Sequence, residues 1–210
     1  MNMLNLTTFR RGLLAVALGT CATLASAAST FHVELNTLTL GSNGWIDIQL
    51  GGAPMDPSPA WAKLSHFGGF IQPASAQLSD VTGSLATGYT LDTTLNGWSE
   101  LRHEVNYAGG KISFDLSIDG APGNSNSSFS VALFDAQGDL LQYPVSSDGF
   151  SALNLEFVPA ATAGGHGTLL LSGYDNGLVQ ITAVPEPSSW LMLGAGVALL
   201  GLVRRRQLPA

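Results

Sequence analysis

The chain has 210 residues, which is enough for one domain once terminal targeting segments are set aside. It carries 15 acidic and 8 basic residues, a formal net charge of −7. Residues 28–183 hold 14 of the acidic residues and only three of the basic ones, so their net charge is near −11. Such a domain repels phosphate backbones, which excludes nucleic acid as an expected partner.

Residues 1–27 have the three parts of a secretory signal peptide. Arg10 and Arg11 precede an uncharged apolar run at 12–24, and Ala-Ser-Ala at 25–27 forms a cleavage site for signal peptidase. The run is shorter than the roughly 20 residues that span a bilayer, which favours cleavage over a permanent anchor or a buried helix. The only cysteine, Cys21, leaves with this peptide, so the exported chain has no disulfide. Lipidation of Cys21 is the alternative, but lipoprotein signals favour a residue smaller than Thr20 before the cysteine.

Residues 28–183 alternate between apolar and polar side chains, the pattern of half-buried strands. Residues 31–40 and 45–50 alternate on either side of Gly-Ser-Asn-Gly, which predicts a β-hairpin. Further strands are expected at 111–118, 129–133, 152–158, 168–172 and 178–184. About nine short strands with one apolar face predict an all-β fold, an antiparallel β-sandwich with a jelly-roll-like arrangement.

Residues 51–74 interrupt this alternation with several prolines and glycines. We expect a long surface loop there, and long ordered loops often carry function. Trp61, His66, Phe67 and Phe70 would give this loop an aromatic character.

The C-terminal segment has three elements in a fixed order. Pro185, Glu186 and Pro187 come first, 14 uncharged residues follow at 190–203, and Arg204, Arg205 and Arg206 end the segment. The prolines fix φ and remove backbone donors, so this stretch stays extended and accessible to a protease. The apolar run predicts a short transmembrane helix, and the arginines mark its cytoplasmic end. A plain membrane anchor with a proline-rich linker is the alternative.

Residues 184–206 resemble the PEP-CTERM sorting signal of Gram-negative bacteria, and residues 207–210 form a short tail after it. The resemblance implies processing by an exosortase, a membrane-embedded transpeptidase-like cysteine protease. It also implies a transient stay in the inner membrane, followed by release or attachment at the cell surface.

The middle of the chain resembles an extracellular family that occurs with this tail. The stretches FHVELNTLTLGSNGWIDIQLGG, PASAQLSDVTGSL and SSFSVALFDAQGDLL carry the resemblance. It implies a β-hairpin that opens the domain and a sandwich that follows, with no defined activity. The setting of this family implies a role among exopolysaccharides or in biofilm.

Acidic turns are the candidates for a calcium site, because calcium requires clustered oxygen ligands. Asp135 and Asp139 lie in one expected turn, and Asp175 lies in another. Solvated turns without an ion are the simpler interpretation.

Exposed aromatic residues are the candidates for binding a polysaccharide. If Ile46 and Ile48 face the core, Trp45 points outward, and Trp61 lies in the expected loop. The loop covering the hairpin is the alternative arrangement.

Catalytic motifs are missing from the sequence: it has no nucleophile elbow, no HExxH and no phosphate-binding glycine loop. The four histidines, His32, His66, His103 and His166, are far apart in sequence. We therefore predict a non-enzymatic, exported structural or adhesive protein without a cofactor, calcium aside. A carbohydrate-binding module is the alternative, and a glycoside hydrolase with a carboxylate pair fits less well.

Overall fold

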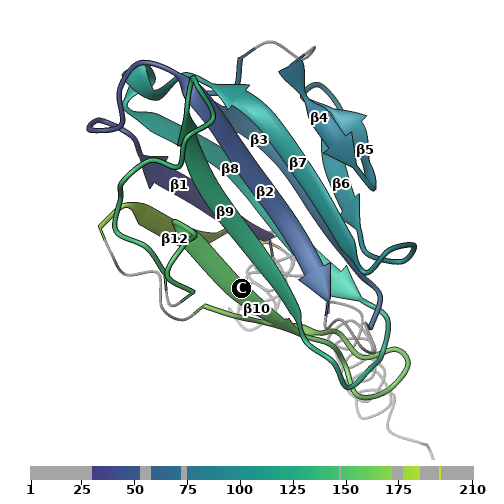
Figure 1. Cartoon of the computed structure of the whole chain (residues 1–210). Helices are drawn as coiled ribbons and strands as arrows, with labels where there is room; N and C mark the ends of the chain where they lie inside the picture. The colour runs from purple at the N-terminus through teal and green to yellow at the C-terminus, as the bar shows by residue number, and fades with distance from the viewer. Residues whose placement is uncertain are drawn as a thin grey trace, which may run out of the picture. The chain divides into compact units, whose positions relative to one another are not determined.

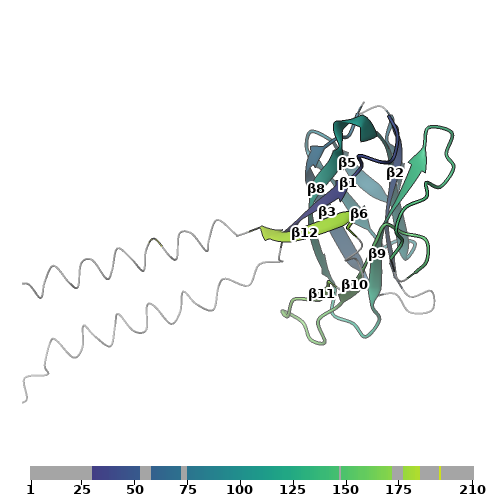
Figure 2. The same ribbon diagram turned by 90° about the vertical axis from the view of Figure 1, so that its left-hand side faces the viewer.

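The computed structural model of the chain describes residues 30–52, 58–71, 75–146, 148–171 and 177–184, together with Gly194. The described strands form two six-stranded antiparallel sheets within one compact unit, Ala28–Pro185 (Figures 1 and 2). Sheet A has the order β12-β1-β8-β3-β6-β5, and sheet B has the order β11-β10-β9-β2-β7-β4. The predicted all-β fold with antiparallel sheets is therefore confirmed.

The strand bounds follow the chain. Sheet A contains β1 (Thr30–Asn36), β3 (Ala60–Gly68), β5 (Val81–Ser84), β6 (Gly88–Asp92), β8 (Lys111–Gly120) and β12 (Val179–Val184). Sheet B contains β2 (Gly44–Gly52), β4 (Gln77–Ser79), β7 (Trp98–Val105), β9 (Ser127–Asp135), β10 (Leu153–Val158) and β11 (Thr168–Leu170). The strands expected around 45–50, 111–118, 129–133, 152–158, 168–172 and 178–184 are present, whereas the strand expected over 31–40 ends at Asn36.

The core lies between the two sheets and is built from the inward residues of each alternating strand. On β8 every second residue is buried, and β2 and β9 bury their apolar residues against the facing sheet. Phe114 of sheet A and Phe129 of sheet B meet there, with ring centroids 6.4 Å apart. Burial of such side chains contributes about 1.5–3 kcal/mol each. This apolar layer stabilises a domain whose described residues contain no cysteine.

The hairpin expected from residues 31–50 is wrong, because β1 and β2 lie in different sheets. β1 pairs with β8 and β12, whereas β2 pairs with β7 and β9. The connecting residues cross from one sheet to the other: the Thr37 hydroxyl donates to the carbonyl of Tyr107, and Leu40 is buried in the core. These two contacts direct the chain across the edge of the core. The Gly-Ser-Asn-Gly run therefore belongs to a connection between the two sheets and not to a hairpin turn.

The long surface loop expected at 51–74 is also wrong over much of its length. Residues 60–68 form β3, an interior strand of sheet A between β8 and β6. Ala60, Ala62 and Leu64 are buried and alternate with exposed or half-exposed residues. Alanine contributes little to an alternating hydrophobic pattern, and the neighbouring prolines indicated a loop, so the sequence did not predict this strand. Pro59 precedes the strand, where a missing donor costs no ladder hydrogen bond.

The 3₁₀ turn η2 (Tyr107–Gly109) links β7 to β8 and ties the sheets together at one end. The fully buried Tyr107 places its hydroxyl 2.8 Å from the carbonyl of Trp45 and 2.9 Å from that of Phe134. A Cβ atom at Gly44 would lie 2.7 Å from this ring and 2.1 Å from the carbonyl of Phe134, so only glycine fits beside it. Burial raises the pKa of the Tyr107 phenol, which stays protonated as a donor.

Apart from Gly194, the terminal predictions lie outside the described residues. These are the signal peptide at 1–27, the motif Pro185, Glu186 and Pro187, the transmembrane segment, the arginines at 204–206 and the tail. Within the described part of the chain, the structure has no helix with the length and apolar character to span a bilayer.

We expect Tyr107→Phe to lower the free energy of unfolding by about 1–3 kcal/mol, because two buried carbonyls lose their donor. Urea denaturation followed by tryptophan fluorescence measures this change. An unaltered midpoint would show that these carbonyls do not depend on the phenol.

Candidate functional site

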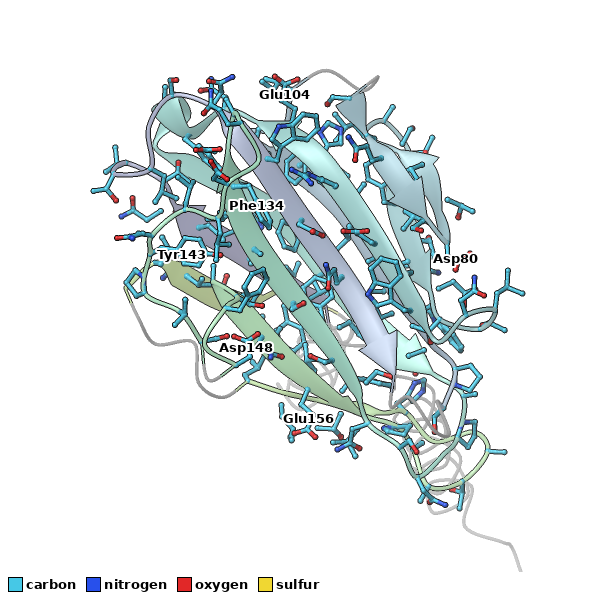
Figure 3. The ribbon with its side chains drawn as sticks, viewed as in Figure 1. Asp80, Glu104, Phe134, Tyr143, Asp148 and Glu156 are labelled. Atoms are coloured by element: carbon cyan, nitrogen blue, oxygen red, sulfur yellow. The ribbon has the colours of Figure 1, made fainter. Side chains whose placement is uncertain are left out.

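The outer surface of sheet B carries aromatic, acidic, basic and amide side chains. Ile46 and Ile48 point into the core as predicted, so Trp45 and Asp47 point outward. Figure 3 shows this surface, with Phe134 above β9 and Glu104 on β7. We call it the sheet-B face and define it by the outward residues Trp45, Asp47, Gln49, Trp98, Glu100, Arg102, Glu104, Ser130, Phe134 and Asn154.

Arg102 is held on this face by aromatic rings. Its guanidinium carbon lies 5.4 Å from the ring centroid of Trp45 and 5.2 Å from that of Phe134, within cation–π range. The buried Nε atom has no hydrogen-bond partner among the described residues. The two rings therefore fix the position of the Arg102 guanidinium, which keeps N–H groups that can donate hydrogen bonds.

Asp47 lies beside Arg102 in the ladder and is only 7% exposed, although it faces outward. Burial, followed by the hydrogen bond and negative charge of Glu100, raises its pKa to about 7, against smaller opposing effects of Gln49 and Arg102. Its Oδ1 atom has no donor among the described residues. With a pKa of about 7, Asp47 is partly protonated near neutral pH and can donate a hydrogen bond as well as accept one.

Trp98 begins β7 and is 39% exposed. It stands opposite Gly51, where an added Cβ atom would lie 3.5 Å from the indole Cδ1. Gly51 is six residues beyond Trp45 on β2, which separates the two indoles by roughly 20 Å along the strand. The two tryptophans thus lie at opposite ends of the polar strip formed by Asp47, Glu100 and Arg102.

The segment between β9 and β10 borders the sheet-B face (Figure 3). The Tyr143 hydroxyl accepts from the amide of Leu133 and donates to the carbonyl of Phe150. Asp148 accepts hydrogen bonds from two backbone amides and from Ser146; partial burial alone would raise its pKa, but these donors lower it to about 2. The half-exposed Phe150 lies 6.4 Å from Phe134, centroid to centroid, and adds a further ring to the face.

The residues proposed for calcium are used for turn geometry where the structure describes them. Oδ1 of Asp135 accepts from the amides of Gln137 and Asp139, at 2.9 Å each. Asp175 lies outside the described residues. Within the described ranges, no group of three or more His, Cys, Asp or Glu side chains is arranged to hold a metal ion. The calcium site stays a prediction.

The two tryptophans proposed for sugar binding are on different faces. Trp45 belongs to sheet B, whereas Trp61 belongs to β3 and faces outward from sheet A, opposite Asp92 and Asp119. The sequence reasoning gave no role to Asp47, Glu100 or Arg102. The alternation in 98–105, where each outward residue after Trp98 is charged, was the signal that could have located this strip.

Residues 183–207 match the family model of the PEP-CTERM protein-sorting motif. The resemblance of the C-terminal segment is thereby confirmed, and the chain carries a sorting signal that directs it out of the cell for processing by an exosortase. Searches among curated proteins and solved structures found no match to the chain.

The raised pKa of Asp47 predicts a pH dependence of stability. The folded-state pKa of about 7 exceeds the ordinary pKa of 3.8, so the stabilising contribution of Asp47 is complete below pH 3.8 and is lost as the pH rises towards 7. In the parent, the free energy of unfolding should therefore fall between pH 4 and pH 7 as Asp47 loses its proton. Asp47→Asn should lack this fall.

Urea denaturation of both proteins across this range measures the effect, with Asp139→Asn in an exposed turn as the control. The difference in free energy of unfolding between variant and parent reports on Asp47 alone, because both proteins contain His103. Burial lowers the pKa of His103, whose contribution is instead lost as the pH falls below 6.5. Parallel pH profiles for Asp47→Asn and its parent would contradict the raised pKa of Asp47.

Proposed function

We propose that the exported sandwich is a non-enzymatic adhesive protein of the cell surface or extracellular matrix that binds extracellular polysaccharide on the sheet-B face. Export and exosortase processing follow from the sorting motif. Before processing, the apolar segment at 190–203 would hold the chain in the inner membrane. The observation that carries the proposal is the polar strip between two outward tryptophans, with a ring-stacked arginine at its Trp45 end.

The chemistry of the strip suits hydroxyl-rich ligands. Indole rings offer a large apolar surface for the C–H face of a sugar ring, and few precisely placed polar groups give orientation. Arg102 donates, the Asp47–Glu100 pair accepts and donates, and Gln49 does both. Because Asp47 is partly protonated near neutral pH and Arg102 is a cation, the strip is less negative than its two carboxyl groups alone would make it. It therefore fits uncharged sugars better than the acidic domain as a whole suggests.

The spacing of the carboxyl groups supports binding without hydrolysis. Asp47 and Glu100 are within hydrogen-bonding distance of each other. Glycoside hydrolases separate their two carboxyl groups by about 5–10 Å so that a sugar or a water fits between them. A directly bonded pair leaves no such space, which favours a role in orienting a ligand.

We expect Trp98→Ala to weaken binding to neutral polysaccharide from the host matrix at least tenfold, because exposed aromatics dominate binding surfaces. Trp61→Ala on sheet A is the matched control and should bind as the parent does. Affinity electrophoresis of the exported chain in gels with neutral and uronic-acid-rich polysaccharides measures both. Equal retardation of all three proteins would refute a role for the sheet-B face, and release of reducing sugar would refute the non-enzymatic assignment.

A further inference from the structure

Sheet A ends on β12, a strand with a neighbour on one side only. β12 pairs with β1 and is the last strand in the order of its sheet (Figure 2). A terminal strand of this kind presents amide and carbonyl groups that no neighbouring strand satisfies, and another strand can pair with them. The outer edge of β12 is therefore a candidate interaction surface.

The register of β12 shows which of its backbone groups point away from β1. The amide of Asn36 donates to the carbonyl of Leu178 at 2.8 Å, and hydrogen-bonded pairs recur at every second residue of an antiparallel ladder. The even-numbered residues of β12 therefore bond to β1. The amide and carbonyl groups of Ile181 and Ala183 point to the open side, where neither residue forms a hydrogen bond within the described part of the chain.

The other terminal strands of the two described sheets are protected from pairing. β4 and β11 have three residues each, and β5 has four, with Gly83 at a φ of +109°. Short or irregular edge strands are common devices against association. β12 has six residues with the sequence VQITAV, which contains no charge, proline or glycine. Among the terminal strands that the structure describes, β12 alone lacks such protection.

The sequence of β12 fits a second copy of itself in antiparallel orientation. A two-fold axis at Thr182 places Ile181 of one copy opposite Ala183 of the other, so their outward amide and carbonyl groups can exchange hydrogen bonds. Ile181 packs against the core and would face the small side chain of Ala183. On the outer surface of the sheet, Thr182 would face Thr182 of the other copy, and Gln180 would face Val184.

The charge distribution supports a second copy as the partner. Residues 28–183 carry a net charge near −11, so two copies repel each other over most of their surfaces. β12 has no charged residue, and Glu34, which lies opposite Gln180 on β1, is paired with Lys111 at 2.8 Å. Pro185 follows the strand and has no amide to donate, which ends the pairing. The edge of β12 is thus a short uncharged segment on an acidic domain.

We propose that two copies of the exported chain associate through β12, with Thr182 on the two-fold axis, and so join their A sheets into one continuous sheet. Backbone hydrogen bonds of Ile181 and Ala183 hold the two copies together. Because the contact involves few residues of each copy, the dimer should dissociate reversibly on dilution. The proposal concerns the edge of sheet A and is independent of the sheet-B face.

Sedimentation velocity of the exported chain over a range of concentrations tests this association. The parent should show a reversible equilibrium between monomer and dimer. Thr182→Lys and Thr182→Glu each place like charges opposite each other at the axis, so each should weaken dimerisation by about tenfold. An equimolar mixture of these two variants brings opposite charges together and should restore the dimer. Thr82→Lys, at an exposed position of the terminal strand β5, is the matched control and should dimerise as the parent does.

A cysteine on the axis reports the register directly, because residues 28–210 contain no cysteine. Thr182→Cys should form a disulfide-linked dimer under mild oxidation, since directly opposite residues bring their Cβ atoms to about 4.5–5.5 Å. Thr82→Cys should stay monomeric under the same conditions. Ala183→Pro removes an amide that points away from β1, so we expect it to abolish the dimer while the unfolding midpoint stays near that of the parent.

Three results would overturn the proposal. The first is a parent that stays monomeric at every concentration. The second is dimerisation of Thr182→Lys and Thr182→Glu, each alone, as tightly as the parent, or a mixture of the two that remains monomeric. The third is growth of the parent into assemblies larger than a dimer, because a closed two-fold pair leaves no β12 edge free for a further copy.

Discussion

The pairing of β1 with both β8 and β12 is the constraint on which the rest of sheet A depends. β1 is the first described strand and β12 the last, and their register places Thr30 opposite Val184. Sheet A is therefore complete only when residues at the far end of the chain have joined it. Contacts of such long sequence separation form slowly, and no described cysteine secures them. The apolar residues that β1 and β12 turn towards the core hold this arrangement in place.

The same pairing connects the fold to its sorting signal. The matched motif begins at residue 183, within β12, so the signal continues directly from a strand of the folded sheet. The chain consequently enters and leaves the sandwich at neighbouring positions of one sheet edge. The register of β1 with β8 also sets His32 opposite Asp115, and the bulge in β3 supplies His66 from the other side. Strand pairing thus brings His32, Asp115 and His66 together on the outer surface of sheet A.

The sequence predicted the class of fold because alternation survives in strands with strong apolar residues, such as β8 with Ile112, Phe114 and Leu116. It failed where the inward residues are small, as in β3 with Ala60 and Ala62, and where a turn-like run connects different sheets. It made the outward position of Trp45 depend on the burial of Ile46 and Ile48, and both isoleucines are buried. The pairing of β2 with β7 is a property of the whole fold, so the contact of Asp47 with Glu100 could not be predicted from the sequence. The same holds for His32 and His66, which are 34 residues apart and meet only through β8.

Hydrogen exchange of the exported chain, followed by mass spectrometry, tests the position of β1 most directly. An interior strand donates its amides to neighbours on both sides, so residues 31–35 should exchange as slowly as those of β8 and only with global unfolding. The short edge strand β11 should exchange much faster. If the amides of β1 exchange as fast as those of β11 while β8 stays protected, β1 is not enclosed by β8 and β12.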